Sequence, residues 1–265
     1  MLTLKIGIQT ASLRLPLRKA LHTAAQLGAT AIEIDARDDL RPADLSETAA
    51  RQFRKLLKDL NLKLAAVRFR TRRGYDVADD LDRRITATKQ AMNMAYALGS
   101  SVVINQIGPI PEPPAAGEVN DAWTRMTEAV VDMARYGDRA GAFLTAGTGT
   151  ESGTRMVEFI QSLPAGALRV NFDPGQLIVN GFSAAEAVRE LGPYIAHVHA
   201  NDAVRDLAQG RGLNVPLGRG AVDYEDLLAH LENHEYRGYL TITRDGADDP
   251  VGEIGQAVEY LKNLA

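Results

Sequence analysis

LRVNFD at residues 168–173 and YIAHVHA at residues 194–200 are the two stretches that decide the fold of this chain. Each is a short, mostly apolar run that ends on or next to a side chain able to bind a ligand, Asp173 in the first and His199 in the second. Apolar runs without polar alternation are typical of strands in a parallel sheet that is covered on both faces. A helical pattern at about 183–191 separates the two runs, as a parallel crossover connection requires.

The same alternation of strand and helix extends in both directions along the chain. Six further strand-like runs bring the total to eight: KIGIQT (5–10), TAIEIDA (30–36), LKLAAVRFR (62–70), SVVINQ (101–106), GAFLTAG (141–147) and GYLTIT (238–243). The other helical patterns lie at about 17–27, 44–60, 78–98, 119–140, 152–163, 223–233 and 251–263. Glycine or asparagine precedes several of the strands, as expected where a helix ends and the next strand begins.

Eight such units predict an α/β fold, a single-domain (β/α)8 TIM barrel that spans residues 1–265. The proline-rich segment at 108–118 is interpreted as a loop after the fourth strand and not as a domain boundary. A doubly wound open sheet is the alternative. It is disfavoured because TASLRLP, and not a glycine-rich phosphate-binding turn, follows the first strand.

The composition restricts the classes of function. The chain has 265 residues, 45% of them hydrophobic, and a net charge of −4, which is typical of a globular protein with a sizeable core. The acidic balance argues against a nucleic-acid partner, and the absence of cysteine excludes disulfides and thiolate metal sites. No apolar run reaches the roughly 18 residues needed to span a membrane, and the first residues lack the apolar core of a signal peptide. A cytoplasmic protein without a membrane partner is expected.

A barrel predicts where a ligand binds, because active sites lie at the carboxyl ends of the strands. Polar side chains at these ends are the candidates for substrate binding: Glu33, Arg68, Arg70, Gln176, Asp202 and Arg244. Glu33 either contacts a sugar hydroxyl or pairs with a nearby arginine. The run RFRTRRGYD, which holds Arg68 and Arg70, either captures a phosphate or carboxylate or pairs with the acidic segment DVADDLD that follows it.

Asp202 and His197 each have two interpretations as well. Asp202 either accepts a hydrogen bond from the His199 imidazole, the usual way of orienting a metal-bound histidine, or pairs with an arginine such as Arg205. His197 lies on the same side of its strand as His199. Both histidines suit a metal ion, but His197 is interpreted as a packing residue inside the barrel.

Two longer stretches carry a resemblance to a known family. VNFDPGQLIVNG at 170–181, and IAHVHANDAVRD at 195–206 with the following VPLGRGAVDYEDLLAHLENHEYRGYLTI, resemble the xylose isomerase-like TIM-barrel family. That family contains sugar and sugar-phosphate isomerases and epimerases, and the similarity extends over essentially the whole chain. It implies a divalent metal (Mn, Mg or Zn) held by a Glu on strand five, an Asp on strand six, a His on strand seven and a Glu on strand eight. The two glutamates of the family commonly move a proton between adjacent sugar carbons.

Carried over by position, the resemblance assigns the metal ligands Asp173 and His199. Gly147 stands at the position of the strand-five glutamate and Thr243 at that of the strand-eight glutamate. Neither residue supplies a carboxylate for a metal or for proton transfer. Asp245 lies two residues beyond Thr243, which displaces its carboxylate by roughly 6–7 Å along the strand.

Two functions follow from this pattern. The first is a divergent, non-catalytic homologue that binds a sugar or polyol-like ligand. The alternative is an active isomerase or epimerase whose site is rearranged or metal-poor. Both take a small sugar or sugar-phosphate-like molecule as the partner, and both leave a homo-oligomer open.

Overall fold

The computed structural model describes residues 4–206, 208 and 210–264. The barrel strands are β1 (Ile6–Gln9), β2 (Ala31–Asp35), β3 (Lys63–Arg68), β4 (Val102–Asn105), β5 (Phe143–Gly147), β6 (Arg169–Phe172), β7 (Ile195–Ala200) and β10 (Leu240–Ile242). They form a closed barrel in the order β1-β10-β7-β6-β5-β4-β3-β2, with parallel pairing throughout. The predicted (β/α)8 barrel is therefore confirmed, and the open-sheet alternative is wrong.

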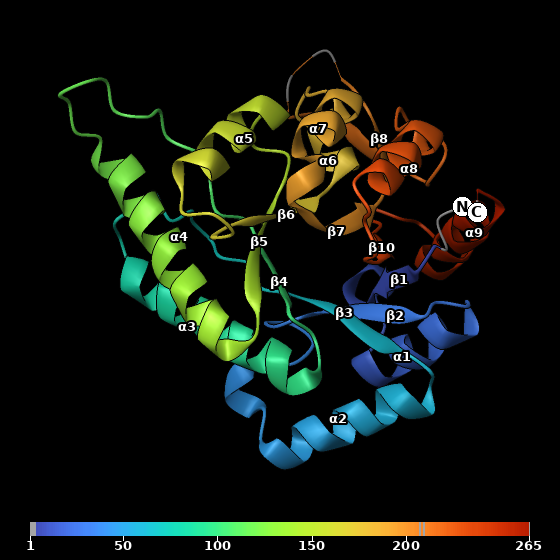
Figure 1. Ribbon diagram of the computed structural model, residues 1–265. Coiled ribbons are helices and arrows are strands. Elements are labelled where there is room, and N and C mark those ends of the chain that lie inside the picture. Colours follow the sequence, from blue (N-terminus) through green and yellow to red (C-terminus); the bar gives the residue numbers. More distant parts are fainter. Residues whose placement is uncertain (1–3, 207, 209, 265) are drawn as a thin grey trace.

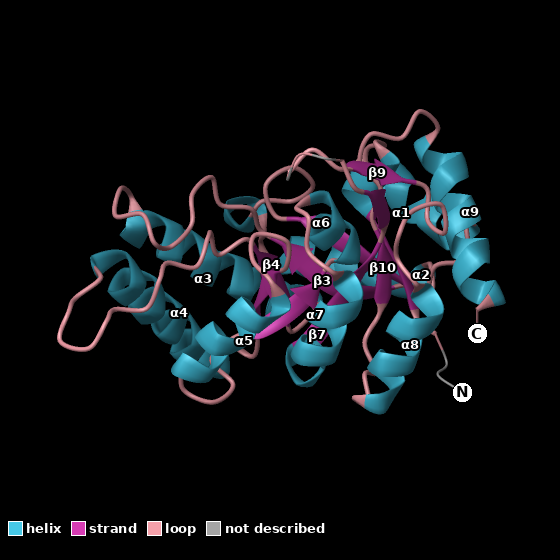
Figure 2. Ribbon diagram, turned by 90° about the horizontal axis from the view of Figure 1, so that it is seen from above, coloured by secondary structure: helices cyan, strands magenta, loops and turns pink. Residues whose placement is uncertain are grey.

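Helices cover the outside of the strands (Figures 1 and 2). They are α1 (Leu17–Gln26), α2 (Glu47–Asp59), α3 (Leu81–Leu98), α4 (Asp121–Ala140), α5 (Gly153–Ser162), α6 (Pro174–Val179), α7 (Ala184–Leu191), α8 (Tyr224–Asn233) and α9 (Pro250–Asn263). The described residues also form three short 3-10 helices: η1 (Thr10–Leu13), η2 (Pro42–Asp44) and η3 (Gly192–Tyr194). No helix in the described part of the chain combines the length and the apolar composition that crossing a membrane requires.

Helix α2 illustrates how the sequence produces this outer layer. Ala50, Phe53 and Leu57 are its buried residues, and their spacing of three and four places them on one face of the helix. The Ser46 hydroxyl accepts a hydrogen bond from the Ala49 N–H at 3.1 Å and caps the first turn. The opposite face is polar, so the helix packs on the barrel from one side.

Three short elements of the described structure were not predicted from the sequence. The predicted long loop after β7 contains the antiparallel pair β8 (Asp202–Val204) and β9 (Leu213–Val215). Helix α6 follows β6 directly and precedes the predicted helix that became α7. Three-residue strands and a six-residue helix are too short for hydrophobic periodicity to reveal.

The interior of the barrel contains a set of buried polar side chains. Barrel interiors are dominated by branched apolar residues, but these strands also bury Gln9, Glu33, Asn105, Thr145, Asn171, His197, His199 and Thr241. The strand register shifts between Ile32 and Glu33, and again between Val170 and Asn171. Such irregularities often lie next to active sites, where they redirect a side chain. The buried polar side chains therefore mark the part of the barrel where a functional site is expected.

Candidate functional site

A cavity of about 170 Å³ lies at the carboxyl ends of the barrel strands, where barrels keep their ligands. Most of its lining can form hydrogen bonds: Gln9, Arg68, Arg70, Asn105, Gln106, Asn171, Asp173, Gln176, His199, Asn201, Thr243 and Asp245, together with Ile104. Among the residues predicted to bind substrate, Arg68, Arg70 and Gln176 belong to this lining. Both predicted metal ligands, Asp173 and His199, belong to it as well.

His199 lies between two carboxylates. Its Nε2 is 2.9 Å from Glu33 Oε2, and its Nδ1 is 3.0 Å from Asp173 Oδ2. Glu33 is fully buried, and the Gln9 amide donates to its second oxygen at 2.7 Å. Glu33 therefore contacts histidine, where the sequence analysis expected an arginine or a sugar hydroxyl, and it is absent from the cavity lining.

The charges of the three buried groups depend on one another. Burial would raise the Glu33 pKa, but the charge of His199 and the contacts of both histidines hold this pKa well below its ordinary value. Burial would likewise lower the His199 pKa, yet the charges and hydrogen bonds of Glu33 and Asp173 raise it to about 9. The His197 pKa is lowered, because burial outweighs the attraction of Glu33. At neutral pH the ionised Glu33 therefore lies between a protonated His199 and a neutral His197.

This arrangement predicts a pH-dependent stability. The pKa of His199 rises from 6.5 to about 9 in the folded chain. Its stabilisation is therefore complete below pH 6.5 and is lost as the pH rises through about 9. We expect the free energy of unfolding to fall by roughly 3 kcal/mol over that window, at about 1.4 kcal/mol per pKa unit. Urea unfolding of the wild type and of His199→Gln, both with EDTA, measures this change, and parallel pH profiles of the two proteins would contradict it.

Asp173 has a second task beside its contact with His199. It is the N-cap of α6, and its Oδ1 accepts from the Gln176 N–H at 2.9 Å and from the Asn201 side-chain amide at 2.9 Å. Its Oδ2 faces the His199 ring. The sequence allows Asp173 either to be a metal ligand or to order the turn PGQ that follows it. In the structure both oxygens already have protein partners, and the sharp turn into α6 depends on one of them.

Gly147 and Thr243, which stand at the positions of the two family glutamates, each lie next to a side-chain amide. An added Cβ on Gly147 would come within 2.5 Å of the Gln106 side-chain nitrogen, so the Gln106 amide lies where a strand-five side chain would begin. The Thr243 hydroxyl accepts a hydrogen bond from the Asn201 amide at 2.9 Å. One neutral amide therefore lies beside each position, and among the described residues Asp173 does not belong to a group of three or more metal-binding side chains.

Arg68, the last residue of β3, is the notable cation of the cavity. Its guanidinium makes no hydrogen bond or ion pair with any residue that the structure describes. Arg70, by contrast, pairs with Asp35 at 3.2 Å and with Asp38 at 2.6 Å. Arg73 pairs with the acidic segment downstream, as one interpretation of this arginine run predicted. Of the run, Arg68 is therefore the side chain left to neutralise an acidic ligand in the cavity.

Two other candidates, Asp202 and Arg244, lie outside the cavity lining. The Asp202 carboxylate accepts from four backbone N–H groups at 2.8–3.1 Å, those of Ala203, Gly218, Gly220 and Val222. The predicted contact of Asp202 with His199 is therefore wrong, and Asp202 instead orders the β8–β9 connection. Arg244 donates to Glu253 of α9 at 2.6 Å, and neither Asp202 nor Arg244 lines the cavity.

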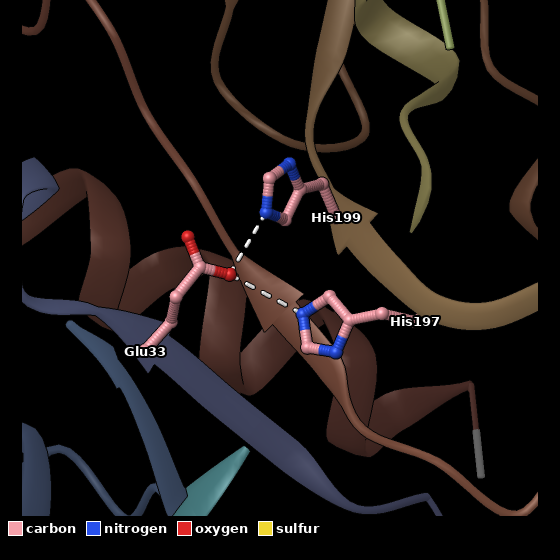
Figure 3. Close-up of side chains that lie close together, drawn as sticks. All are labelled: Glu33, His197 and His199. Carbon is pink, nitrogen blue, oxygen red and sulfur yellow. Dashed lines mark hydrogen bonds and ion pairs between the residues drawn. The ribbon is translucent and has the colours of Figure 1, made fainter. Parts of the chain in front are cut away.

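Sequence reasoning missed how Glu33, His197 and His199 gather. A carboxylate oxygen and one nitrogen from each ring all lie within 4.8 Å of one another. Figure 3 shows the Glu33 carboxylate pointing toward both rings. The spacing of the two histidines gave half of this cluster, because both rings point to the same side of β7. The other half needed the distance across the barrel, which the linear sequence does not contain.

Comparisons with known proteins support the fold. A family model described as "Xylose isomerase-like TIM barrel" matches residues 21–264. The search against curated protein sequences returned no match for this chain.

Solved structures give similar barrels over nearly the whole chain. A xylose isomerase domain protein from Planctomyces limnophilus is 23% identical, with a TM-score of 0.86 over 98% of this chain and 97% of that chain. D-allulose 3-epimerase from Methylomonas sp., in complex with D-allulose, is 19% identical, with a TM-score of 0.75 over 100% and 98% of the two chains. A xylose isomerase-like TIM barrel protein from Mycobacterium smegmatis, in complex with magnesium, is 20% identical, with a TM-score of 0.75 over 93% and 87%. At these identities the likeness shows the fold alone.

Proposed function

This chain belongs to the xylose isomerase-like TIM barrel family, and we propose that its cavity binds a sugar or polyol bearing an acid group without isomerising it. The observation that carries the proposal is the cavity lining, which combines neutral hydrogen-bonding side chains with one unpaired arginine. A structural neighbour is D-allulose 3-epimerase in complex with D-allulose, which supports a polyhydroxylated ligand.

The neutral part of the lining suits hydroxyl groups. The side-chain amides of Gln106 and Gln176 have no hydrogen-bond partner among the described residues and can both donate and accept. Gln9, Asn105 and Asn201 already bond to neighbouring protein groups, which fixes their orientation in the cavity wall. The Asn171 side-chain amide lies 3.2 Å from His199 Nδ1 and adds a further polar group to the cavity wall.

Arg68 determines the second property of the ligand. A guanidinium binds carboxylate or phosphate with two parallel hydrogen bonds, and Arg68 has no acidic partner of its own in the described structure. We therefore assign the ligand to sugar acids or sugar phosphates in preference to neutral sugars.

Proton transfer at carbon lacks the two glutamate bases that the family resemblance implies. Moving such a proton requires a positioned base, and Gly147 and Thr243 cannot provide one. Asp173 is engaged through both oxygens. These contacts support binding without isomerisation.

The alternative, an active isomerase with a rearranged site, has one observation in its favour. Asp245 lines the cavity, and its carboxylate has no partner among the described residues. Asp245 would then serve as the base in place of the family glutamates.

The two functions are separated by one pair of measurements. Calorimetric titration with a sugar acid, a sugar phosphate and a neutral ketose tests binding, and proton NMR in heavy water tests exchange at the carbon next to the carbonyl. We expect binding of an acidic sugar and no deuterium incorporation. Absence of binding by every acidic sugar tested would contradict the proposal. Deuterium exchange that is abolished in Asp245→Asn would replace it with the isomerase.

Replacing Arg68 tests the acid-binding role directly. Arg68→Gln should weaken binding of an acidic sugar by about 10- to 100-fold, because a hydrogen bond to a charged group contributes about 1.5–3 kcal/mol. Binding of a neutral analogue should change much less. Arg72→Gln is the matched control, since Arg72 belongs to the same run but lines a neighbouring pocket. An equal loss in both variants would contradict a specific role of Arg68.

A further inference from the structure

Glu33, His197 and His199 converge beneath the floor of the cavity. Figure 3 shows one Glu33 oxygen facing a nitrogen of each histidine ring. Glu33 Oε2 is 2.9 Å from His199 Nε2 and 3.3 Å from His197 Nε2. All three side chains are buried, with residual exposures of 0%, 1% and 5% for Glu33, His197 and His199. We infer that these three residues form a binding site for a divalent transition-metal ion of the Zn²⁺ type.

A buried nitrogen that Glu33 satisfies only poorly is the first support. His197 Nε2 is buried and makes no hydrogen bond within the described structure, although it lies at ion-pair distance from Glu33. A buried polar atom without a partner is costly and calls for an explanation. A cation at the point where the three donor atoms converge would satisfy His197 Nε2 and the Glu33 oxygen together.

The spacing of the donors is the second support. Zn²⁺ binds histidine nitrogen and carboxylate oxygen at about 2.0–2.2 Å, usually in a tetrahedral arrangement, which separates neighbouring donors by about 3.3–3.5 Å. The contacts of 2.9 and 3.3 Å that Glu33 makes are within a few tenths of an ångström of that separation. Two imidazoles and one carboxylate favour Zn²⁺, Co²⁺ or Ni²⁺ over Mg²⁺ or Ca²⁺, which prefer all-oxygen sites.

The surrounding side chains orient the donors as in known metal sites. Metal-bound histidines usually direct their second ring nitrogen to a carboxylate, and His199 Nδ1 faces Asp173 at 3.0 Å. Metal-bound carboxylates are in turn hydrogen-bonded, and Gln9 donates to the other Glu33 oxygen at 2.7 Å. When a metal binds to His199 Nε2, the proton on that nitrogen is released to solvent.

This site differs from the one implied by the family resemblance. The resemblance pairs His199 with Asp173 in the mouth of the barrel, whereas here Asp173 orients the ring and the metal lies on the opposite nitrogen. The inference does not rest on the proposed function, because Glu33 and His197 are not part of the cavity lining and only His199 is shared by the two sites. Failure of one proposal therefore leaves the other standing.

Metal titration of variants tests the assignment. After EDTA treatment and its removal, we expect wild-type protein to bind one Zn²⁺ by calorimetry, and Co²⁺ to give the visible absorption of nitrogen-coordinated cobalt. His197→Gln should lose at least about 100-fold in affinity, since even the loss of an orienting residue costs about 10- to 100-fold. Asp173→Asn should lose only about 10-fold and should keep the cobalt spectrum. His230→Gln, a histidine variant on the outer helix α8, should bind like the wild type.

The opposite results would overturn the inference. They are the absence of Zn²⁺ binding by the wild type, or a larger loss in Asp173→Asn than in His197→Gln, which would place the ion in the mouth. Circular dichroism and urea unfolding check that the variants fold. If His197→Gln does not fold, nitrogen-15 histidine NMR of the wild type replaces it. Zn²⁺ must then shift the Nε2 signals of both His197 and His199, and an unchanged His197 signal would equally overturn the site.

Discussion

Glu33→Gln is expected to destabilise the folded protein by about 3–5 kcal/mol at neutral pH, the cost of removing one partner of a buried charged pair. His199, with its pKa raised to about 9, would then keep a single carboxylate partner in a buried environment. Urea unfolding in the presence of EDTA measures the change. Histidine NMR should also show a lower His199 pKa in the variant, because the Glu33 charge is the largest of the factors that raise it.

Glu259→Gln is the matched control for this experiment. Glu259 pairs with Lys262 at 2.9 Å on the surface of α9, where the glutamate side chain is 67% exposed. Solvent screens such a pair, so its loss should cost less than about 0.5 kcal/mol. A Glu33→Gln protein that is as stable as the Glu259→Gln protein would show that the buried cluster contributes little to folding.

Gly147→Glu combined with Thr243→Glu is expected to create a manganese site in the mouth of the barrel. The two carboxylates would join Asp173 and His199 to complete the four ligands that the family resemblance implies. Gln106 must leave the space that it occupies over Gly147, so we include Gln106→Ala in the variant. The gain should change Mn²⁺ binding from undetectable to micromolar, a difference of at least about 4 kcal/mol if the parent is weaker than millimolar.

The design separates this new site from the cluster beneath the cavity floor. The three changes are made in the His197→Gln background, so that the Glu33 cluster does not contribute to the titration. Manganese binding is followed by electron paramagnetic resonance, which counts the free ion. Gln106→Ala alone in the same background is the control. A folded variant that gains no manganese would show that Gly147 and Thr243 do not face a common point with Asp173.

Local features of the sequence predicted most of the architecture. Apolar runs and helix-stop residues located every barrel strand, and GYLTIT at 238–243 contains β10 as the eighth of them. The same pattern failed between β7 and β10, where β8 and β9 are too short for periodicity. Asp173 and His199 were also brought together correctly by the rule that strand ends meet at one rim. The sequence allowed Asp173 to order the turn PGQ but did not predict α6, the short helix that Asp173 caps directly after that strand.

The partner of Glu33 was out of reach of this reasoning. Glu33 and His199 are 166 positions apart in the chain, and an alternating strand pattern places each residue on a face without naming what lies opposite. The arginine run shows the same limit. Its sequence allowed either ion pairs or ligand binding, and the structure assigns Arg70 and Arg73 to ion pairs while Arg68 lines the cavity.

Sequence alone determined the number, order and direction of the barrel strands, because hydrophobic runs and turn residues act within a few neighbours along the chain. It also determined that Gly147 and Thr243 offer no carboxylate at two strand ends. Only the tertiary structure decided that His199 holds the proton shared within the buried cluster. It also decided that, of the two arginines in the cavity lining, Arg68 has no acidic partner among the described residues. Those outcomes depend on desolvation and on Coulomb interactions over a few ångströms, and closure of the barrel sets those distances.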